Sequence, residues 1–291
     1  MPSGSLTPDP RPGTLYVAAT PLGNLKDITL RTLEVLSAVD FVVCEDTRRT
    51  RKLLTAHGIS RPLVSCHDYN EARQVPAIVR RLLKGESCAL ATDAGTPMVS
   101  DPGYLLVSRA AEAGVPVVPL PGPSAVVAAL SASGLPAERF LFAGFLPKKP
   151  GARKRALAEL AAEPGAVVFY ESPQRVAALV KDLAAAWGPR RAVLAREMTK
   201  VHEQMLRGTL DEIAAALAVS KVRGECTLVV EGAGRMGESM DRQEVDRVIL
   251  QELSAQGSVS AAAAAAAQIT GRPKREIYQR ALVLQKEKAG K

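Results

Sequence analysis

Ionisable side chains stand directly after, or within a few residues of, short apolar runs of this sequence. The groups placed in this way include Glu45, His67, Glu171, Glu197 and Lys200. A carboxylate or an imidazole can take a proton from a weakly acidic hydroxyl, and a lysine shielded from water can lose its own proton nearer neutrality. The pattern indicates acid–base chemistry, with helix capping or packing as the alternative role for each side chain.

The segment 87–103, SCALATDAGTPMVSDPG, changes abruptly from an apolar run into glycine, proline and aspartate. Its first part predicts a short buried strand. The glycines and prolines that follow prevent regular structure, so backbone N–H and C=O groups stay free to meet a ligand. A second loop, PLPGPSA at 119–125, follows the apolar run 115–118 and leads into a helix with Ser124 near its N-cap. Both loops are candidate ligand sites at strand ends.

Short apolar runs alternate with helical patterns along most of the chain. Cys44, Cys66 and Cys88 are 22 residues apart at each step, about one strand plus one helix, which favours a mainly parallel, doubly wound sheet. A second α/β unit is expected from the strand 140–145 onward. Beyond about residue 234, helical patterns at 241–253 and 274–284 flank an alanine run, an arrangement typical of a helix-turn-helix module.

The changes in composition and in apolar pattern along the sequence predict that the chain has four parts. Residues 1–12 are expected to be a disordered tail because they are rich in proline. They also lack the pattern of a signal peptide. We predict an N-terminal α/β domain at 13–124, a second α/β domain at 125–235 and a C-terminal helical domain at 236–291.

Composition narrows the class of protein. The chain has 291 residues and a formal net charge of +8, which favours an anionic partner such as nucleic acid. Its four cysteines lack the spacing of metal ligands, so we expect no metal site and reduced thiols in a cytoplasmic protein. No apolar run is long enough to span a membrane, so no membrane partner is expected.

Three basic segments could contact a phosphate backbone. The first is CEDTRRT at 44–50. The second is 147–155, which has five cations and no acid and is expected to be a loop because prolines stand on both sides of its two lysines. The third is the last helix. The candidate nucleic-acid contacts are Arg48, Arg49, Lys148, Lys149, Arg153, Lys154, Arg155, Lys274 and Arg275.

Four segments in chain order resemble the tetrapyrrole methylase superfamily of S-adenosylmethionine enzymes. They are LYVAATPLGNLKDIT at 15–29, CEDTRRT at 44–50, DAGTPMVSDPG at 93–103 and PLPGPSA at 119–125. Within it the chain is similar to the ribosomal RNA small subunit methyltransferase I branch, which methylates a ribose 2′-hydroxyl in the decoding centre. The resemblance implies two consecutive α/β domains with the cofactor in the cleft between them, plus a small C-terminal helical domain. It also implies a homodimer.

The resemblance implies a set of residues that hold S-adenosylmethionine. They are Leu22, Asp93, Gly95, Thr96, Met98, Val99, Ser124, Ala125, Tyr170, Arg196 and Cys226. Many superfamily members have Gly-Asp-Pro where this chain has Gly95-Thr96-Pro97, so the carboxylate is missing. Asp93 is a candidate substitute, with a local role in holding the loop as the alternative.

The function implied is 2′-O-methylation of a cytidine ribose in 16S rRNA of the small ribosomal subunit. Glu45 and Lys200 are the predicted catalytic residues, with His67, Glu171 and Glu197 also open as the group that removes the hydroxyl proton. Two alternatives remain. One is a C-methyltransferase for a tetrapyrrole precursor of cobalamin or siroheme, and the other is a non-enzymatic nucleic-acid-binding protein that uses the C-terminal helices.

Overall fold

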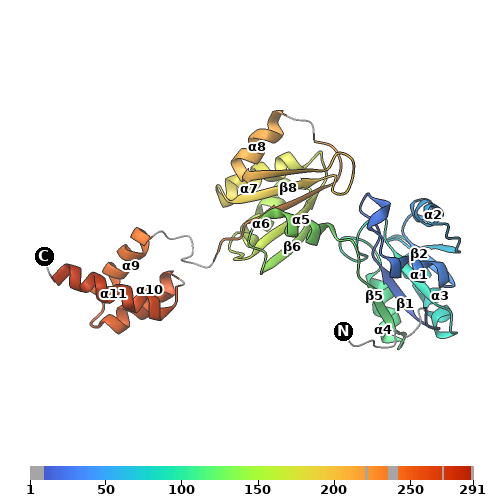
Figure 1. Cartoon of the computed structure of the whole chain (residues 1–291), viewed down its shortest axis with the longest axis horizontal. Helices are drawn as coiled ribbons and strands as arrows, with labels where there is room; N and C mark the ends of the chain where they lie inside the picture. The colour runs from blue at the N-terminus through green and yellow to red at the C-terminus, as the bar shows by residue number, and fades with distance from the viewer. Residues whose placement is uncertain (1–9, 220–221, 235–241, 271, 290–291) are drawn as a thin grey trace.

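The computed structural model describes residues 10–219, 222–234, 242–270 and 272–289, which form two sheets and a group of helices (Figure 1). The predicted fold class, two α/β units followed by a helical domain, is confirmed. The predicted disordered tail falls mostly on residues 1–9, and the predicted boundary at 236 falls within 235–241; both stretches lie outside the described residues.

The first sheet is entirely parallel and has the strand order β3-β2-β4-β1-β5. Its strands are β1 (Leu15–Ala18), β2 (Phe41–Cys44), β3 (Leu63–Ser65), β4 (Cys88–Ala91) and β5 (Val117–Leu120). The connections contain the short 3-10 helix η1 (Leu25–Asp27) and the helices α1 (Leu30–Ala38), α2 (Thr47–Ala56), α3 (Glu71–Leu83) and α4 (Tyr104–Glu112). Separate apolar clusters cover the two faces of this sheet, which explains why β1, β2 and β4 are apolar and buried throughout.

Strand β5 differs from the sequence-based expectation. The apolar run at 115–118 predicted a strand followed by a loop from Pro119, whereas the strand runs to Leu120 and Pro119 is in register with Val17. Strand β5 is the edge of the sheet, where a proline is tolerated because the N–H on the open side has no ladder bond to make.

The second sheet is mixed and has the order β6-β7-β10-β8-β9. Its strands are β6 (Phe140–Phe145), β7 (Ala166–Glu171), β8 (Arg191–Arg196), β9 (Gln204–Thr209) and β10 (Cys226–Val230). Only β6 and β7 are parallel neighbours. The helices α6 (Pro150–Leu160), α7 (Val176–Trp187) and α8 (Leu210–Val219) pack on one face, and α5 (Ala125–Ser133) packs on the other.

The basic segment 147–155 is not wholly a loop, so that prediction was wrong from Pro150 onward. Pro150 opens helix α6, because a proline at the first helical position has no N–H bond to lose and already has a helical φ. Arg153, Lys154 and Arg155 therefore project from a helix.

The C-terminal helices form a unit of their own, as predicted. They are α9 (Arg242–Ala255), α10 (Val259–Thr270) and α11 (Lys274–Ala289). Small alanines of α10 let the three helices pack around one apolar cluster that includes Ile249 and Ile277. Figure 1 shows this unit set apart from both sheets. Within the described residues, no helix combines the length and the apolar character that crossing a membrane requires.

Candidate active site

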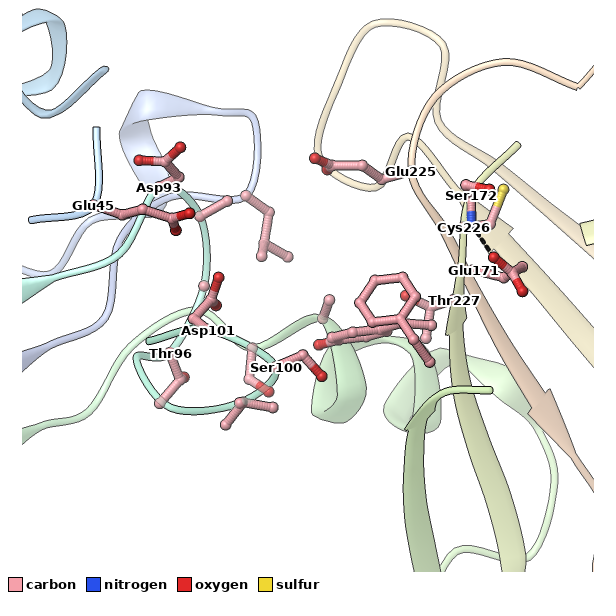
Figure 2. Close-up of a pocket in the computed structure, with 18 of the residues that line it drawn as sticks. Glu45, Asp93, Thr96, Ser100, Asp101, Glu171, Ser172, Glu225, Cys226 and Thr227 are labelled. Carbon is pink, nitrogen blue, oxygen red and sulfur yellow. Dashed lines mark hydrogen bonds between the residues drawn. The ribbon is translucent and has the colours of Figure 1, made fainter. Parts of the chain in front are cut away.

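A cavity of about 410 Å³ lies between the two α/β units, a size typical of small-molecule sites. It is lined by segments at the carboxyl ends of β1, β2, β4 and β5 and by residues of β6, β7 and β10 (Figure 2). The predicted convergence of separate strand-end segments is therefore confirmed. The covalent connection from β5 to α5 passes through the same wall and contributes Ser124 and Ala125.

Hydrogen bonds fix the central loop at 93–103 against its neighbours. The backbones of Thr20 and Gly95 exchange two hydrogen bonds, of 2.8 and 2.9 Å. The Thr96 hydroxyl donates to the carbonyl of Pro123 at 3.0 Å. Met98 and Ser100 have φ values of 69° and 68°, which are unfavourable for side chains other than glycine and persist where surrounding contacts impose them. The loop is thus held in one shape.

Five carboxylates line the cavity: Glu45, Asp93, Asp101, Glu171 and Glu225. Three of them are held by cations: Asp93 by Arg49 at 3.4 Å, Glu171 by Arg175 at 3.0 Å and Glu225 by Lys200 at 3.2 Å. No lysine or arginine in the described parts of the chain forms an ion pair with Glu45 or Asp101.

The two carboxylates without ion pairs have altered acidity. Burial raises the pKa of Asp101 to about 6, assisted by the negative charges of Glu45, Asp93 and Glu225. Burial also raises the pKa of Glu45, again with help from Asp93. Such raised values are typical of groups that exchange protons near neutral pH.

The cavity suits a sulfonium-bearing methyl donor. Carboxylates outnumber cations among its lining residues, which favours a cationic ligand. Leu22, Val99, Phe145 and Tyr170 supply apolar surface for an adenine or a methionine chain. Gly95 has a φ of 83°, and a Cβ added there would lie 3.3 Å from the Leu22 side chain, so the glycine keeps this wall open. The residues present fit S-adenosylmethionine.

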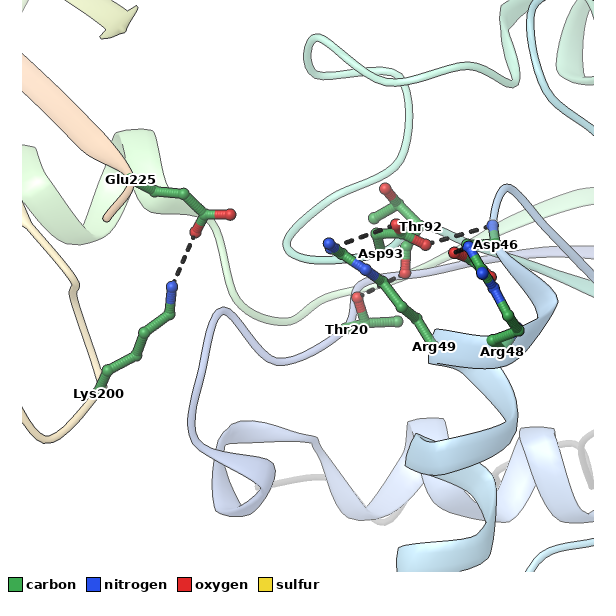
Figure 3. A network of polar contacts seen from close by, with 8 residues as sticks. All are labelled: Thr20, Asp46, Arg48, Arg49, Thr92, Asp93, Lys200 and Glu225. Atoms are coloured by element: carbon green, nitrogen blue, oxygen red, sulfur yellow. Dashed lines mark hydrogen bonds and ion pairs between the residues drawn. The ribbon is translucent and has the colours of Figure 1, made fainter. Parts of the chain in front are cut away.

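Most of the predicted cofactor contacts meet in this cavity. Those that line it are Leu22, Asp93, Gly95, Thr96, Val99, Ser124, Ala125, Tyr170 and Cys226. Met98 and Arg196 do not line it; Arg196 donates through Nε to Gln204 at 2.5 Å. Asp93 also accepts a hydrogen bond from the Asp46 backbone at 3.3 Å, so it holds the β2–α2 turn as well as facing the cavity (Figure 3).

Among the predicted acid–base residues, Glu45 and Glu171 line the cavity, whereas His67, Glu197 and Lys200 do not. The expectation that Lys200 readily loses its proton is wrong for this structure. Partial burial by itself lowers the pKa of Lys200, but the hydrogen bond from Nζ to Glu197 at 2.9 Å and the charge of Glu225 raise it overall. Lys200 is a charged ion-pair partner here.

The predicted RNA contacts separate into exposed and buried side chains. Arg48, Lys148, Lys149, Lys154, Arg155, Lys274 and Arg275 are exposed. Arg49 is also exposed, but it lines the cavity, where it pairs with Asp93. Arg153 is only 8% exposed and is bound to Asp182 at 2.6 Å, so it cannot reach a phosphate in this structure.

Sequence reasoning missed several lining residues. They are Ala94, Ser100, Asp101, Phe145, Ser172, Pro173, Glu225 and Thr227. A signal for Asp101 was present, because it stands in the same DAGTPMVSDPG motif as the predicted cofactor contacts. Glu225 precedes its strand, and the antiparallel direction of β10 brings that end to the cavity. No group of three or more His, Cys, Asp or Glu within the described residues could hold a metal ion.

Residues 14–214 match the family described as Tetrapyrrole (Corrin/Porphyrin) Methylases, and residues 240–285 match the RsmI C-terminal HTH domain. The chain belongs to the tetrapyrrole methylase family. Among its relatives, the ribosomal RNA small subunit methyltransferase I of Xylella fastidiosa (strain Temecula1) is 46% identical and covers 92% of this chain and 98% of its own length. The protein of the same name from Escherichia coli O157:H7 is 44% identical over 93% of this chain and 95% of its own.

Solved structures show the same fold. A uroporphyrin-III C-methyl transferase from Thermus thermophilus, complexed with S-adenyl homocysteine, has a TM-score of 0.55 and 20% identity, covering 75% of this chain and 97% of its own. The methyltransferase CobJ has a TM-score of 0.58 and 19% identity, covering 76% of this chain and 95% of its own. These likenesses establish the architecture of the two α/β units.

Proposed function

We propose that this protein is an S-adenosylmethionine-dependent methyltransferase that 2′-O-methylates a cytidine ribose in the 16S rRNA of the small ribosomal subunit. One observation carries the proposal: relatives named ribosomal RNA small subunit methyltransferase I match at 44–46% identity along both α/β units and the C-terminal helices. The solved tetrapyrrole methyltransferases match about three quarters of the chain at about 20% identity and support only the fold.

The cavity provides the donor site. Thr96, Val99, Ser124 and Ala125 on the first side and Tyr170 and Cys226 on the second would hold S-adenosylmethionine. When bound, this cofactor supplies an electrophilic methyl group on a positively charged sulfur. The carboxylates of the cavity stabilise that positive charge. The sulfur left after methyl transfer is neutral, so the carboxylates attract the product less than the donor, which assists product release. Glu45 stays a candidate for proton removal because it lines the cavity and has a raised pKa.

The RNA-binding role is assigned to exposed cations on three elements. Arg48 lies at the start of α2, Lys154 and Arg155 lie on α6, and Lys274 and Arg275 lie at the start of α11. Such separated cations can contact several phosphates of a folded ribosomal RNA without reading its sequence.

Homodimerisation and a cytoplasmic location complete the proposal. Strand β6 is an edge of its sheet and exposes Phe140, and α5 exposes Val127, which gives the second unit apolar surface that a second copy could cover. Sedimentation should give twice the chain mass. All four cysteines are buried free thiols, as suits a reducing compartment.

The test is incubation with donor carrying a labelled methyl group, in separate reactions with small ribosomal subunits and with a tetrapyrrole precursor. We expect label in 16S rRNA only. Label in the ring would favour the alternative C-methyltransferase, and label in neither substrate would favour a binding protein without activity.

A further inference from the structure

We propose that Asp101 is the catalytic residue that accepts the proton of the ribose 2′-hydroxyl, an assignment that rests on the function proposed above. Among the carboxylates of the cavity, Asp93, Glu171 and Glu225 are each engaged by a cation. An ion pair stabilises the charged form and weakens the carboxylate as a base. Asp101 and Glu45 have no such pair with any lysine or arginine in the described segments, so they are the better candidates.

Position favours Asp101 over Glu45. Asp101 is two residues from Val99, on the loop that would hold the donor, whereas Glu45 follows β2. Figure 2 shows the Asp101 side chain rising from this loop between the two α/β units, toward the side of the cavity where Glu45 and Asp93 lie. A base on the donor loop keeps a fixed position relative to the reacting methyl group, so the hydroxyl can be aligned with both at once.

The loop holds Asp101 firmly. Ser100, directly before it, keeps an unfavourable positive φ of 68°. Gly103, two residues after it, has a φ of 122°, and a Cβ added there would lie 2.7 Å from Leu90, so the chain is pressed against the core at this point. A base held in one place loses little free energy to reorganisation during the reaction.

The groups around Asp101 make it a stronger base than an ordinary aspartate. Burial raises its pKa to about 6; the charges of Glu45, Asp93 and Glu225 add to this effect, and the Thr92 hydroxyl opposes it. Tyr170 lies on the side of the second unit. Burial, and to a smaller extent the charge of Asp101, raises the pKa of Tyr170 to about 12, so its hydroxyl stays neutral. At neutral pH Asp101 is mostly ionised and ready to accept a proton.

The step balances in atoms and charge. The 2′-oxygen forms a bond to the methyl carbon as its proton passes to an Asp101 carboxylate oxygen. The methyl–sulfur bond breaks and leaves its electron pair on sulfur. The products are a methyl ether, a neutral thioether and a protonated Asp101, which returns its proton to water.

The test compares Asp101→Asn with Glu45→Gln in the full chain. Calorimetry should show that both variants still bind the donor, each with a loss of affinity below about 10-fold, because each substitution removes one carboxylate of the cavity and no apolar contact. Turnover with small ribosomal subunits should fall at least roughly 100-fold in D101N, the usual contribution of a general base, and less than about 10-fold in E45Q. Asp101→Glu should recover part of the activity.

Two pH measurements separate a base from a structural residue. The wild-type turnover should lose activity on the acid side with an apparent pKa near 6, and E45Q should move this limb to lower pH because a neighbouring negative charge is gone. Carbon-13 NMR of the free protein should show one aspartate carboxyl that titrates near pH 6 and is missing from D101N.

Unchanged turnover in D101N, or a loss confined to E45Q, would overturn the assignment while leaving the proposed function intact. Failure of the wild-type chain to methylate ribosomal RNA would contradict the proposed function itself, and the assignment with it.

Discussion

At the scale of single residues, ion pairing divides the carboxylates of the cavity into two kinds. Asp93 forms an ion pair with Arg49 of the first α/β unit, and Glu225 forms one with Lys200 of the second (Figure 3). Their charges persist and favour a cationic donor. Asp101 forms no ion pair with a lysine or arginine of the described residues, and burial makes its charged form less favourable in free energy.

This cost gives a stability prediction. Folding raises the pKa of Asp101 from the ordinary aspartate value of 3.8 to about 6, so the unfavourable contribution of its charge is absent at low pH and develops as the pH rises between these values. Asp101→Asn should therefore raise the unfolding free energy at neutral pH by about 1–2 kcal/mol, after allowance for solvent screening. Calorimetry should show a higher melting temperature at about pH 8 and a smaller gain at about pH 5. Equal or lower stability of D101N at both pH values would contradict the raised pKa.

Lys200 gives a second prediction. Because its ammonium is charged and paired with Glu197 and Glu225, Lys200→Met should change turnover by less than about 10-fold, whereas loss of a true base costs roughly 100-fold or more. Lys26→Met, on the exposed surface of η1, is the matched control. A collapse of turnover in K200M alone, with donor binding intact, would return Lys200 to the role of base.

Two of the loops that line the cavity could be predicted from sequence, because glycine and proline mark irregular backbone at strand ends. The loops that carry Thr96 and Ser124 were found in this way, whereas the choice of these two residues as donor contacts came from the family resemblance. Lys200 could not be placed, because the direction of its side chain depends on which loop of the other unit it meets. Glu225 was missed because the antiparallel pairing of β10 cannot be read from an apolar run alone.

At the scale of elements, the loop after β1 and the loop between β8 and β9 form a second, non-covalent contact between the two α/β units. The backbone N–H of Asn24 donates to the Thr199 hydroxyl at 3.1 Å. The aliphatic part of the Lys200 side chain passes close to Gly23. A Cβ added to Gly23 would lie 2.3 Å from the Cγ of Lys200. Glu197 and Thr199 have positive φ values of 51° and 66°, so the second loop is held in a strained shape where it makes this contact.

The contact predicts an effect of Gly23→Ala on donor binding. The new methyl group must displace Lys200 from its path, which loosens the link between two cavity walls, since Leu22 and Glu225 belong to those walls. Overpacking of this kind costs about 1 kcal/mol or more, so donor affinity measured by calorimetry should fall roughly 5-fold. Gly151→Ala is the control, because nothing lies within 4 Å of its added Cβ. Equal affinities for G23A and G151A would show that the loop contact does not support the donor site.

Helix α6 gives a prediction about Arg153. Its guanidinium is buried and binds Asp182 through Nε at 2.7 Å and Nη2 at 2.6 Å. Arg153→Ala should destabilise the second unit by about 2–4 kcal/mol because Asp182 loses its partner, whereas exposed Lys154→Ala should cost less than about 0.5 kcal/mol. Chemical unfolding followed by Trp187 fluorescence measures both variants. Similar stability of the two would contradict the structural role of Arg153.

The strands of the first sheet were predictable because buried parallel strands are short continuous apolar runs of regular spacing. Strand β9 was missed, since Gln204–Thr209 is only partly buried and mixes polar residues with Met205 and Leu206. The start of α6 was missed because Pro150 and Gly151 are typical of loops. The helix is stabilised by the burial of Leu157 in the core of the second unit, which the local sequence does not show.

At the scale of the whole molecule, a negatively lined cavity belongs to a chain with a net charge of +8. The positive charge is therefore carried elsewhere, partly on the C-terminal unit, where Lys274 and Arg275 are exposed at the start of α11. The negative cavity attracts a small cationic donor, and the positive surfaces elsewhere attract a large anionic substrate. The two ligands therefore do not compete for the same surface.

The double substitution Lys274→Ala and Arg275→Ala should weaken binding to small ribosomal subunits about 10-fold and lower the salt dependence of binding, because two phosphate contacts are lost. Donor affinity should not change, since both residues lie outside the cavity. Gln279→Ala, an exposed neutral position on the same helix, is the control. Unchanged affinity of the double variant for the subunit would contradict a role for this helix in RNA binding.

The central claim is that the cavity directs a methyl group to a ribose hydroxyl of ribosomal RNA. Alkaline cleavage of 16S rRNA after reaction tests it most directly, because the 2′-oxygen is the nucleophile in that cleavage and its methylation blocks the bond that follows. We predict one new resistant position, at a cytidine, that appears with the wild-type chain and donor and fails to appear with D101N. Incorporated label that leaves every bond cleavable would place the methyl group on a base and contradict the account.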